Sequence, residues 1–113
     1  MQSGMTEGSA PQALDGVKVV ELGTLIAGPF AGRIMADFGA TVIKVENPSS
    51  PDPMRTWGRV QGARRSLWWA VQSRNKTSVG LDLKSDEGAA RLRELLDEAD
   101  VLIENFRPGT LER

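Results

Sequence analysis

Residues 17–46 of the chain read VKVVELGTLIAGPFAGRIMADFGATVIKVE, and this stretch decides the fold. It begins with an apolar, β-branched run at 17–22 and ends with a second such run at 41–45. Neither run alternates strongly between polar and apolar residues, which is typical of strands buried on both faces of a parallel sheet. Between them, Pro29 suits the first turn of a helix and Gly39 marks its end. This order of strand, helix and strand predicts an α/β fold.

Apolar residues at helical spacing indicate which face of this helix is buried. The set comprises Ala31, Ile34, Met35 and Phe38. We expect these four side chains to pack against the sheet that the two flanking strands begin.

The rest of the chain repeats the pattern. Residues 77–83 (TSVGLDL) and 100–104 (DVLIE) predict two more strands, and Ser85 is a suitable N-cap for a helix between them. Residues 67–72 predict a short helical turn, and 110–113 the start of a further helix. This order of strands and helices along the chain predicts a mainly parallel, Rossmann-like sheet with right-handed crossover helices. The apolar stripe of the helix after Ser85 consists of Leu92, Leu95, Leu96 and Ala99.

Length and composition limit the classes of protein that remain. The 113 residues suffice for one small domain, which we place at 14–113 after a polar, disordered leader at 1–13. The formal net charge of −1 gives no reason to expect binding of nucleic acid or of an anionic membrane. No apolar stretch approaches the roughly 20 residues that span a bilayer, and the leader does not have the pattern of a signal peptide. We therefore predict a cytoplasmic protein.

The chain contains neither cysteine nor histidine. This excludes disulfides, thiolate or histidine metal sites, and nucleophilic dyads or triads that depend on histidine within these residues. Chemistry in this chain would have to use carboxylates, lysine, arginine or backbone groups, and we expect no metal.

Three predicted loops follow strands, at the edge where parallel sheets bind ligands. They are 23–28, the segment from Glu46 onward, and 104–109. Backbone N–H groups of 23–28 could bind phosphate at a helix N-terminus, but the spacing matches neither GxGxxG nor a Walker A loop, and a tight turn explains it equally. Glu46 stands where a dinucleotide-binding fold keeps its ribose-binding acid, so an NAD-binding α/β fragment is one alternative.

Residues 47–66 form a long stretch with three prolines and several arginines, namely Arg55, Arg59, Arg64 and Arg65. These cations indicate either an anion-binding patch or a solvated loop. The nearby Trp57, Trp68 and Trp69 could stack on a purine or pack against protein. The pair Asn75-Lys76 is typical of a turn with a surface lysine.

Four separated motifs run from residue 14 to the end of the chain. They read LDGVKVVEL (14–22), AGPFAGRIMADFGATVIKVE (27–46), SRNKTSVGLDLKSDEGAARLRELL (73–96) and ADVLIENFRPGTLER (99–113). In this order and spacing they resemble the start of the class III CoA-transferases, a family that also includes the α-methylacyl-CoA racemases. The resemblance implies the N-terminal part of a larger, CoA-binding large domain in an enzyme that forms an interlocked homodimer.

The resemblance also implies a reaction. Family members move CoA from an acyl-CoA to a small carboxylic acid through an aspartate, whose carboxylate attacks the thioester and divides the exchange into easier steps. None of the aspartates in this chain matches that nucleophile, which would lie beyond Arg113. We therefore expect the isolated chain to be inactive.

Carried over position by position, the resemblance assigns CoA contacts to residues after three predicted strands. Backbone groups of the first set would bind the pantetheine amides, Phe106 would give apolar contact, and Lys84 and Arg113 would meet phosphates. The assigned residues are Leu25, Ile26 and Ala27; Leu81, Asp82, Leu83 and Lys84; Asn105, Phe106 and Arg107; and Arg113.

Two residues depart from the formyl-CoA branch of the family, which has Gln at the position of Ile26 and a CoA-contacting Arg at that of Asn47. An oxalate or formyl activity is therefore not expected, and Arg55 or Arg59 could replace the missing phosphate contact. The pair Asn75-Lys76 and the segment at 67–72 favour a transferase over the racemase alternative. A non-enzymatic binding module remains a third interpretation.

Overall fold

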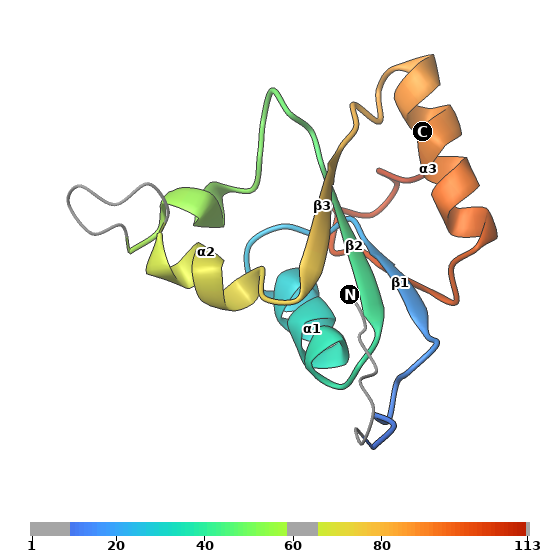
Figure 1. Cartoon of the computed structure of the whole chain (residues 1–113). Coiled ribbons are helices and arrows are strands. Elements are labelled where there is room, and N and C mark those ends of the chain that lie inside the picture. The colour runs from blue at the N-terminus through green and yellow to red at the C-terminus, as the bar shows by residue number, and fades with distance from the viewer. Residues whose placement is uncertain (1–9, 59–65, 113) are drawn as a thin grey trace.

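The computed structural model describes residues 10–58 and 66–112. In chain order its elements are β1 (Lys18–Glu21), α1 (Ala27–Asp37), β2 (Thr41–Glu46), the 3₁₀ helix η1 (Pro53–Thr56), α2 (Leu67–Gln72), β3 (Lys76–Gly80), α3 (Asp86–Asp97) and β4 (Val101–Ile103). Figure 1 shows the strands side by side, with α1 and α3 on opposite faces.

The four strands form one parallel sheet in the order β3-β2-β1-β4. In the two pairings that β1 makes, Val19 lies opposite Val42 of β2 on one side and Val101 of β4 on the other. The predicted α/β class and parallel sheet are therefore confirmed. The chain adds β2 and β3 on one side of β1 but β4 on the other, so the strand order reverses between β1 and β4. Open parallel sheets bind their ligands at such a switch point.

Each face of the sheet has its own apolar core. Under α1, Val19 and Val42 pack with Ala36 and Ala40. Under α3, the buried residues Val20, Leu22 and Val45 meet the predicted stripe of that helix, which confirms it. Ser85 caps α3 as expected, because its Oγ accepts a hydrogen bond from the Gly88 N–H at 2.9 Å.

The predicted buried face of α1 is largely wrong. Of the four residues expected there, Met35 packs against the core, whereas Ile34 and Phe38 are 38% and 54% exposed. The buried residues of the helix are small or cyclic: Gly28, Pro29, Gly32 and Ala36. They let the helix axis approach the sheet closely, since a Cβ at Gly32 would collide with the Glu21 carboxylate. The face of α1 that packs on the sheet is therefore determined by how closely the helix can approach the sheet, and not by large apolar side chains.

A row of apolar side chains lies on the outer side of α1 as a consequence. Ile26, Phe30, Ile34 and Phe38 follow one another at intervals of four residues and are all exposed. We call this row the α1 ridge. No helix among residues 10–58 and 66–112 is long and apolar enough to cross a membrane.

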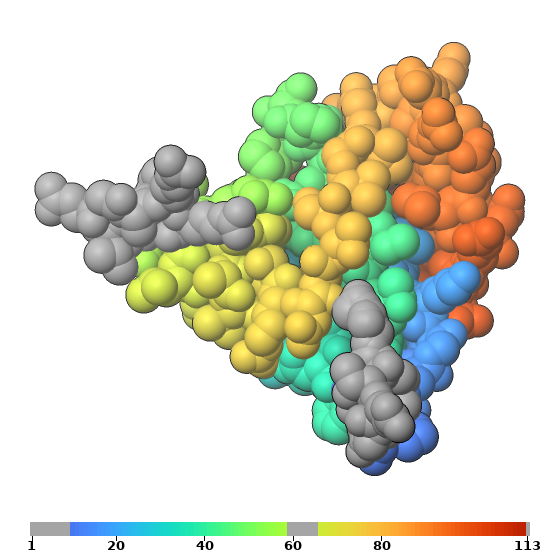
Figure 2. All heavy atoms as spheres, viewed as in Figure 1, coloured from blue at the N-terminus to red at the C-terminus, as the bar shows by residue number. Residues whose placement is uncertain are grey.

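Two smaller corrections concern the ends of elements. The strand predicted at 77–83 is β3, which ends at Gly80, and Leu81 and Leu83 pack over the α3-side core. Residues 110–112 form a turn in place of the expected helix, and Arg113 lies outside the described residues. In the space-filling view, β3 runs down the middle of the visible face between α2 (yellow-green) and α3 (orange), in agreement with its place at the sheet edge (Figure 2).

The close approach of α1 predicts an unusual response to Gly32→Ala. Alanine in place of glycine inside a helix normally stabilises by about 0.5–1 kcal/mol. Here we expect a loss of about 1–3 kcal/mol in the free energy of unfolding, because the new methyl group overpacks against Glu21. Urea denaturation measures both this variant and the control Ala31→Gly, on the exposed side of the same helix, which should show only the ordinary propensity loss. A Gly32→Ala chain more stable than the parent would contradict the packing described.

Candidate functional site

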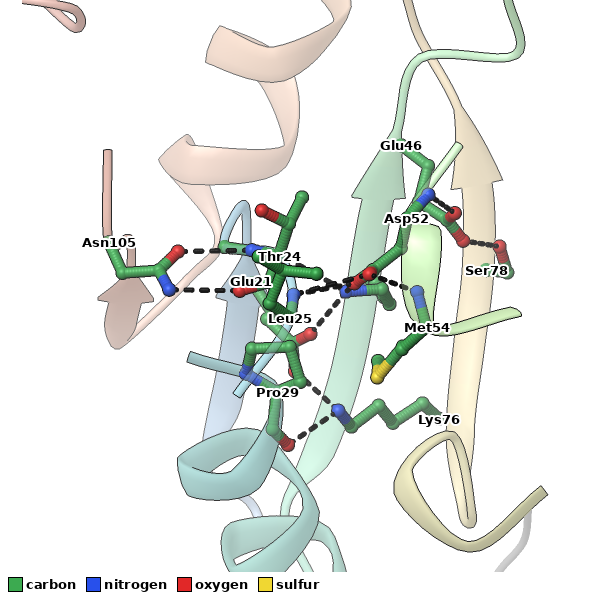
Figure 3. Close-up of polar contacts among 12 residues, drawn as sticks. Glu21, Thr24, Leu25, Pro29, Glu46, Asp52, Met54, Lys76, Ser78 and Asn105 are labelled. Atoms are coloured by element: carbon green, nitrogen blue, oxygen red, sulfur yellow. Dashed lines mark hydrogen bonds and ion pairs between the residues drawn. The ribbon is translucent and has the colours of Figure 1, made fainter. Parts of the chain in front are cut away.

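The loop at 23–28 lies at the carboxyl edge of the sheet, between the end of β1 and the start of α1. Asn105, which follows β4, holds this loop from across the switch point (Figure 3). Its Oδ1 accepts the Thr24 N–H at 3.0 Å, and its Nδ2 donates to the Thr24 carbonyl at 2.9 Å. Position 23 requires glycine beside these two hydrogen bonds, since a Cβ there would lie 2.5 Å from Asn105 Oδ1. Two of the three predicted loops are thus joined.

Four charged side chains are buried beneath this loop, on the α1 face of the sheet, and we call them the lysine–carboxylate cluster. Lys44 Nζ lies 2.8 Å from Glu21 Oε2 and 3.0 Å from Asp52 Oδ2. Lys76 Nζ lies 2.7 Å from Glu21 Oε1. All four side chains are at most 2% exposed. Two cations therefore meet two carboxylates away from water, in the close pairing that buried charges need.

The two lysines of the cluster also hold the loop by its backbone. Lys44 Nζ donates to the Gly23 carbonyl at 3.0 Å, and Lys76 Nζ donates to the Pro29 carbonyl at 2.8 Å. The Gly23 carbonyl is at the start of the 23–28 loop, and the Pro29 carbonyl lies one residue beyond its end, in the first turn of α1. Burial lowers the pKa of the Lys76 ammonium, and the contact with Glu21 opposes that shift. The sequence interpretation of Lys76 as a surface residue is wrong, because α1 covers it.

Asp52 connects the loop to η1 and to β2. Its two carboxylate oxygens each lie 3.2 Å from the Leu25 nitrogen, and Oδ1 also accepts the Met54 N–H at 3.0 Å as the N-cap of η1. Its own N–H donates to Glu46 Oε2 at 2.8 Å. A segment far along the chain thereby fixes the backbone of the loop that follows β1.

Glu46 does not act here as a ribose-binding acid would. Its Oε2 accepts hydrogen bonds from Asp52 N and Arg55 Nε, and its Oε1 from Arg55 Nη2 and Ser78 Oγ. A carboxylate offers about four acceptor positions, and these donors fill them. Burial raises the pKa of Glu46, but the bonds from Arg55 and Asp52 outweigh it, so the pKa lies below its ordinary value. Donors from the protein itself occupy the acceptor positions that a ribose hydroxyl would need, which removes the basis of the NAD-binding alternative.

The residues that the resemblance assigns to CoA contact lie in different environments, some exposed and some packed in the α3-side core. Leu25, Ile26 and Ala27 are exposed at the carboxyl edge, beside Asn105. Phe106 is half-buried and packs against the α3-side core, whereas Arg107 is exposed. Of the second group, Leu81 and Leu83 are half-buried in that core and Asp82 and Lys84 are exposed, with Asp82 Oδ1 accepting the Lys84 N–H at 3.0 Å. Arg113 lies outside the described residues.

The arginine-rich loop offers less free charge than the sequence indicates. Arg55 pairs with Glu46 at 2.7 Å and lies over the Trp69 ring at 3.9 Å, so it is not free for a phosphate. Trp57 and Trp68 contact one another with ring centroids 5.9 Å apart and remain partly exposed, while Trp69 is buried. The arginines at 59, 64 and 65 lie outside the described residues.

An open groove of about 700 Å³ lies between the end of β3 and α3. Its lining includes Leu81, Asp82 and Arg91, together with Glu87, Glu94 and Glu98. So many carboxylates would repel the phosphates of CoA. The described residues hold no group of three acidic side chains placed to bind a metal ion. The loop at 23–28 is therefore the better candidate for ligand binding.

Sequence reasoning missed the lysine–carboxylate cluster, although two of its members leave a signal. Glu21 and Lys44 are charged residues inside otherwise apolar strands, and both point to the α1 face. A charge in a strand buried on both sides needs a partner of opposite sign. Asp52 and Lys76 carry no comparable signal, because loop and turn positions usually leave such residues in water.

Comparison with known proteins places these features in one family. The model of CoA-transferase family III matches residues 14–113. The chain is 53% identical over 108 residues to succinyl-CoA–D-citramalate CoA-transferase of Chloroflexus aurantiacus, covering 96% of this chain and 27% of that protein. It is 44% identical over 100 residues to the alpha subunit of succinyl-CoA–L-malate CoA-transferase of the same organism, with 88% and 23% covered.

A solved structure agrees with these sequence matches. The crystal structure of a CAIB/BAIF family protein from Brucella suis superposes with a TM-score of 0.81 at 44% identity, covering 91% of this chain and 28% of that one. The chain thus spans about a quarter of the length of the relatives that it matches. The resemblance stated from the four motifs is confirmed.

The burial of the cluster predicts a large effect of Lys44→Met. The substitution keeps the apolar length of the side chain but leaves Asp52 without its cation, while Glu21 keeps Lys76. Removing one partner of a buried pair costs about 3–5 kcal/mol, so we expect a loss of that size in the free energy of unfolding. The control is Arg74→Met, which removes an exposed ion pair with Asp37 of similar length, 2.7 Å. That variant should change stability little. Equal losses in the two variants would contradict the role given to burial.

Proposed function

The chain belongs to CoA-transferase family III, and from this we propose that it forms the CoA-binding edge of an enzyme that moves CoA from an acyl-CoA to a carboxylic acid. The observation that carries the proposal is the loop at 23–28, which meets Asn105 at the switch point of the sheet. A ligand in the crevice there contacts the ends of two neighbouring strands at once.

The start of α1 supports this assignment because its backbone donors are left open. The first N–H groups of a helix have no acceptor within it. Ser85 and Ser66 cap α3 and α2 with their side chains, whereas Ile26, at the N-cap of α1, makes no such bond. The N–H group of the exposed Ala27 can therefore donate to an amide or phosphate oxygen of CoA. Leu25 and Ile26 offer apolar contact to the pantetheine chain.

The cationic and apolar residues of the other loops complete the proposed site. Lys84 and Arg107 are exposed and would pair with phosphates, as would Arg113. The exposed part of Phe106 would contact the adenine or the pantetheine, while the rest of its ring supports the core. Asn105 contributes by holding Thr24.

We propose that the reaction of the whole enzyme runs through an aspartyl intermediate. The aspartate carboxylate attacks the acyl-CoA thioester and expels CoA thiolate, giving a mixed anhydride. The thiolate then attacks the aspartyl carbonyl, which releases the original acid and leaves CoA on the enzyme. The incoming carboxylate repeats these steps in reverse. None of the aspartates in this chain fills the role, so the chain alone would bind CoA without transferring it.

The names of the relatives favour a dicarboxylic acid pair. Both Chloroflexus enzymes are named for succinyl-CoA as donor and for a hydroxylated dicarboxylic acid as acceptor. We propose succinyl-CoA and a dicarboxylic acid of this type as the substrates, and a transferase in preference to a racemase. We further propose a cytoplasmic enzyme in which two copies of the chain associate, since the partly exposed Trp57 and Trp68 need a protein cover.

The proposed site predicts that one residue of the α1 ridge affects CoA affinity and another does not. Ile26→Glu places a negative charge beside the CoA phosphates, and we expect the affinity to fall at least about tenfold. Ile34→Glu makes the same change two turns along the helix and should leave the affinity unchanged. Isothermal titration with CoA measures both variants, with NAD as the control ligand.

Titration of the unmodified chain decides the proposal as a whole. Binding of CoA without binding of NAD supports it. Binding of NAD in preference to CoA, or equal effects of the two glutamates, would refute the site.

A further inference from the structure

Leu25 has a backbone conformation that its residue type disfavours. Its φ is 67°, in the left-handed region, where a Cβ crowds the following carbonyl and glycine is the usual residue. Within residues 10–58 and 66–112 only Asn75, with φ of 65°, shares this feature among non-glycine residues. Asparagine tolerates the region, but leucine does not do so readily. The surrounding structure must therefore hold Leu25 in place.

Asp52 fixes the backbone of Leu25 in this conformation. Both of its carboxylate oxygens lie 3.2 Å from the Leu25 nitrogen. The carboxylate is itself immobile, since it is buried, pairs with Lys44 at 3.0 Å and accepts the Met54 N–H at 3.0 Å. On the preceding residue, Asn105 bonds both the N–H and the carbonyl of Thr24. Figure 3 shows Leu25 between these two supports.

The left-handed turn has a consequence for the binding edge. It directs the chain from the buried end of β1 outward, so that Leu25 and Ile26 are exposed although both are large and apolar. The α-helix starts immediately afterwards at Ala27, and its N-cap residue Ile26 makes no side-chain capping bond. A relaxed φ at Leu25 would rotate the peptides on either side of it and displace this arrangement.

We propose that Asp52 is the positioning residue of the CoA-binding loop. It would act through Leu25, and its carboxylate would not touch the substrate. The buried Lys44 orients Asp52, and Asp52 keeps residues 25–27 in the one conformation that meets acyl-CoA. This inference rests on the proposed function, because it takes 23–28 to be the CoA-contacting loop.

A double-variant experiment separates positioning from general stability. Asp52→Asn keeps the shape of the side chain but removes its charge, and we expect CoA affinity to fall at least about tenfold by titration calorimetry. Leu25→Gly adopts the left-handed conformation without support. The double variant Asp52→Asn/Leu25→Gly should therefore bind CoA within about threefold of Leu25→Gly alone. Its free energy of unfolding should stay as low as that of Asp52→Asn, because Lys44 has still lost a charged partner.

The other left-handed residue provides the matched control. Asn75→Gly also relieves a positive φ, but at the start of β3, away from the carboxyl edge. In the Asp52→Asn background it should restore no CoA affinity. Restoration by Asn75→Gly, or a loss of at least about tenfold in CoA affinity when Asp52→Asn is added to Leu25→Gly, overturns the proposal.

A measurement on the unmodified chain covers the case in which Asp52→Asn does not fold. Amide hydrogen exchange should show the Leu25 N–H strongly protected without ligand, since Asp52 accepts it. Exchange at the rate of a free peptide overturns the positioning role, whether or not CoA binds. A protected Leu25 amide in a chain that binds no CoA instead refutes the proposed function, and with it the purpose assigned to Asp52.

Discussion

The contact of Lys44 with Glu21 and Asp52 is the interaction on which the rest of this structure depends. One ammonium group joins β2 to β1, to the carbonyl of Gly23 and to the start of η1. Such a contact is costly to form, because both signs of charge leave water, and it is costly to break for the same reason. Apolar side chains could fill the volume, but they could not hold a carbonyl in a given direction. The charges therefore fix the geometry of the loop above them.

The same face of the sheet is divided along the strands. Near the start of the strands it is apolar, with Val19 and Val42 under α1, and near their carboxyl ends it carries Glu21 and Lys44. The apolar part supplies stability in the usual way. The charged part lies below the candidate site, and α1 approaches it closely because Gly32 has no side chain. Apolar packing and the contacts that hold the 23–28 loop thus use different stretches of the same two strands.

The sequence predicts much of this fold but little of the cluster. Strand and helix patterns are local, and the stripe from Leu92 to Ala99 follows directly from helical spacing. The buried face of α1 was mispredicted because apolarity was taken as the criterion, whereas Gly32 and Ala36 are buried for their small size. Asp52 and Lys76 could not be placed on the loop, since the backbone groups that they contact there, at Leu25 and Pro29, lie 27 and 47 residues away in the chain. Family motifs located the loop at 23–28, but no motif indicated what holds it.

We propose that the loop at 23–28, held by buried charges, forms the CoA site. Titration of ¹⁵N-labelled chain with CoA, followed by amide chemical shifts, tests it most directly. We expect shifts concentrated at residues 24–28 and 105–107, where the loop meets the end of β4. Little change is expected along the acidic groove of α3, at 85–98. Shifts centred on that groove, with the amides of 24–28 unmoved, would show that CoA does not bind at this loop.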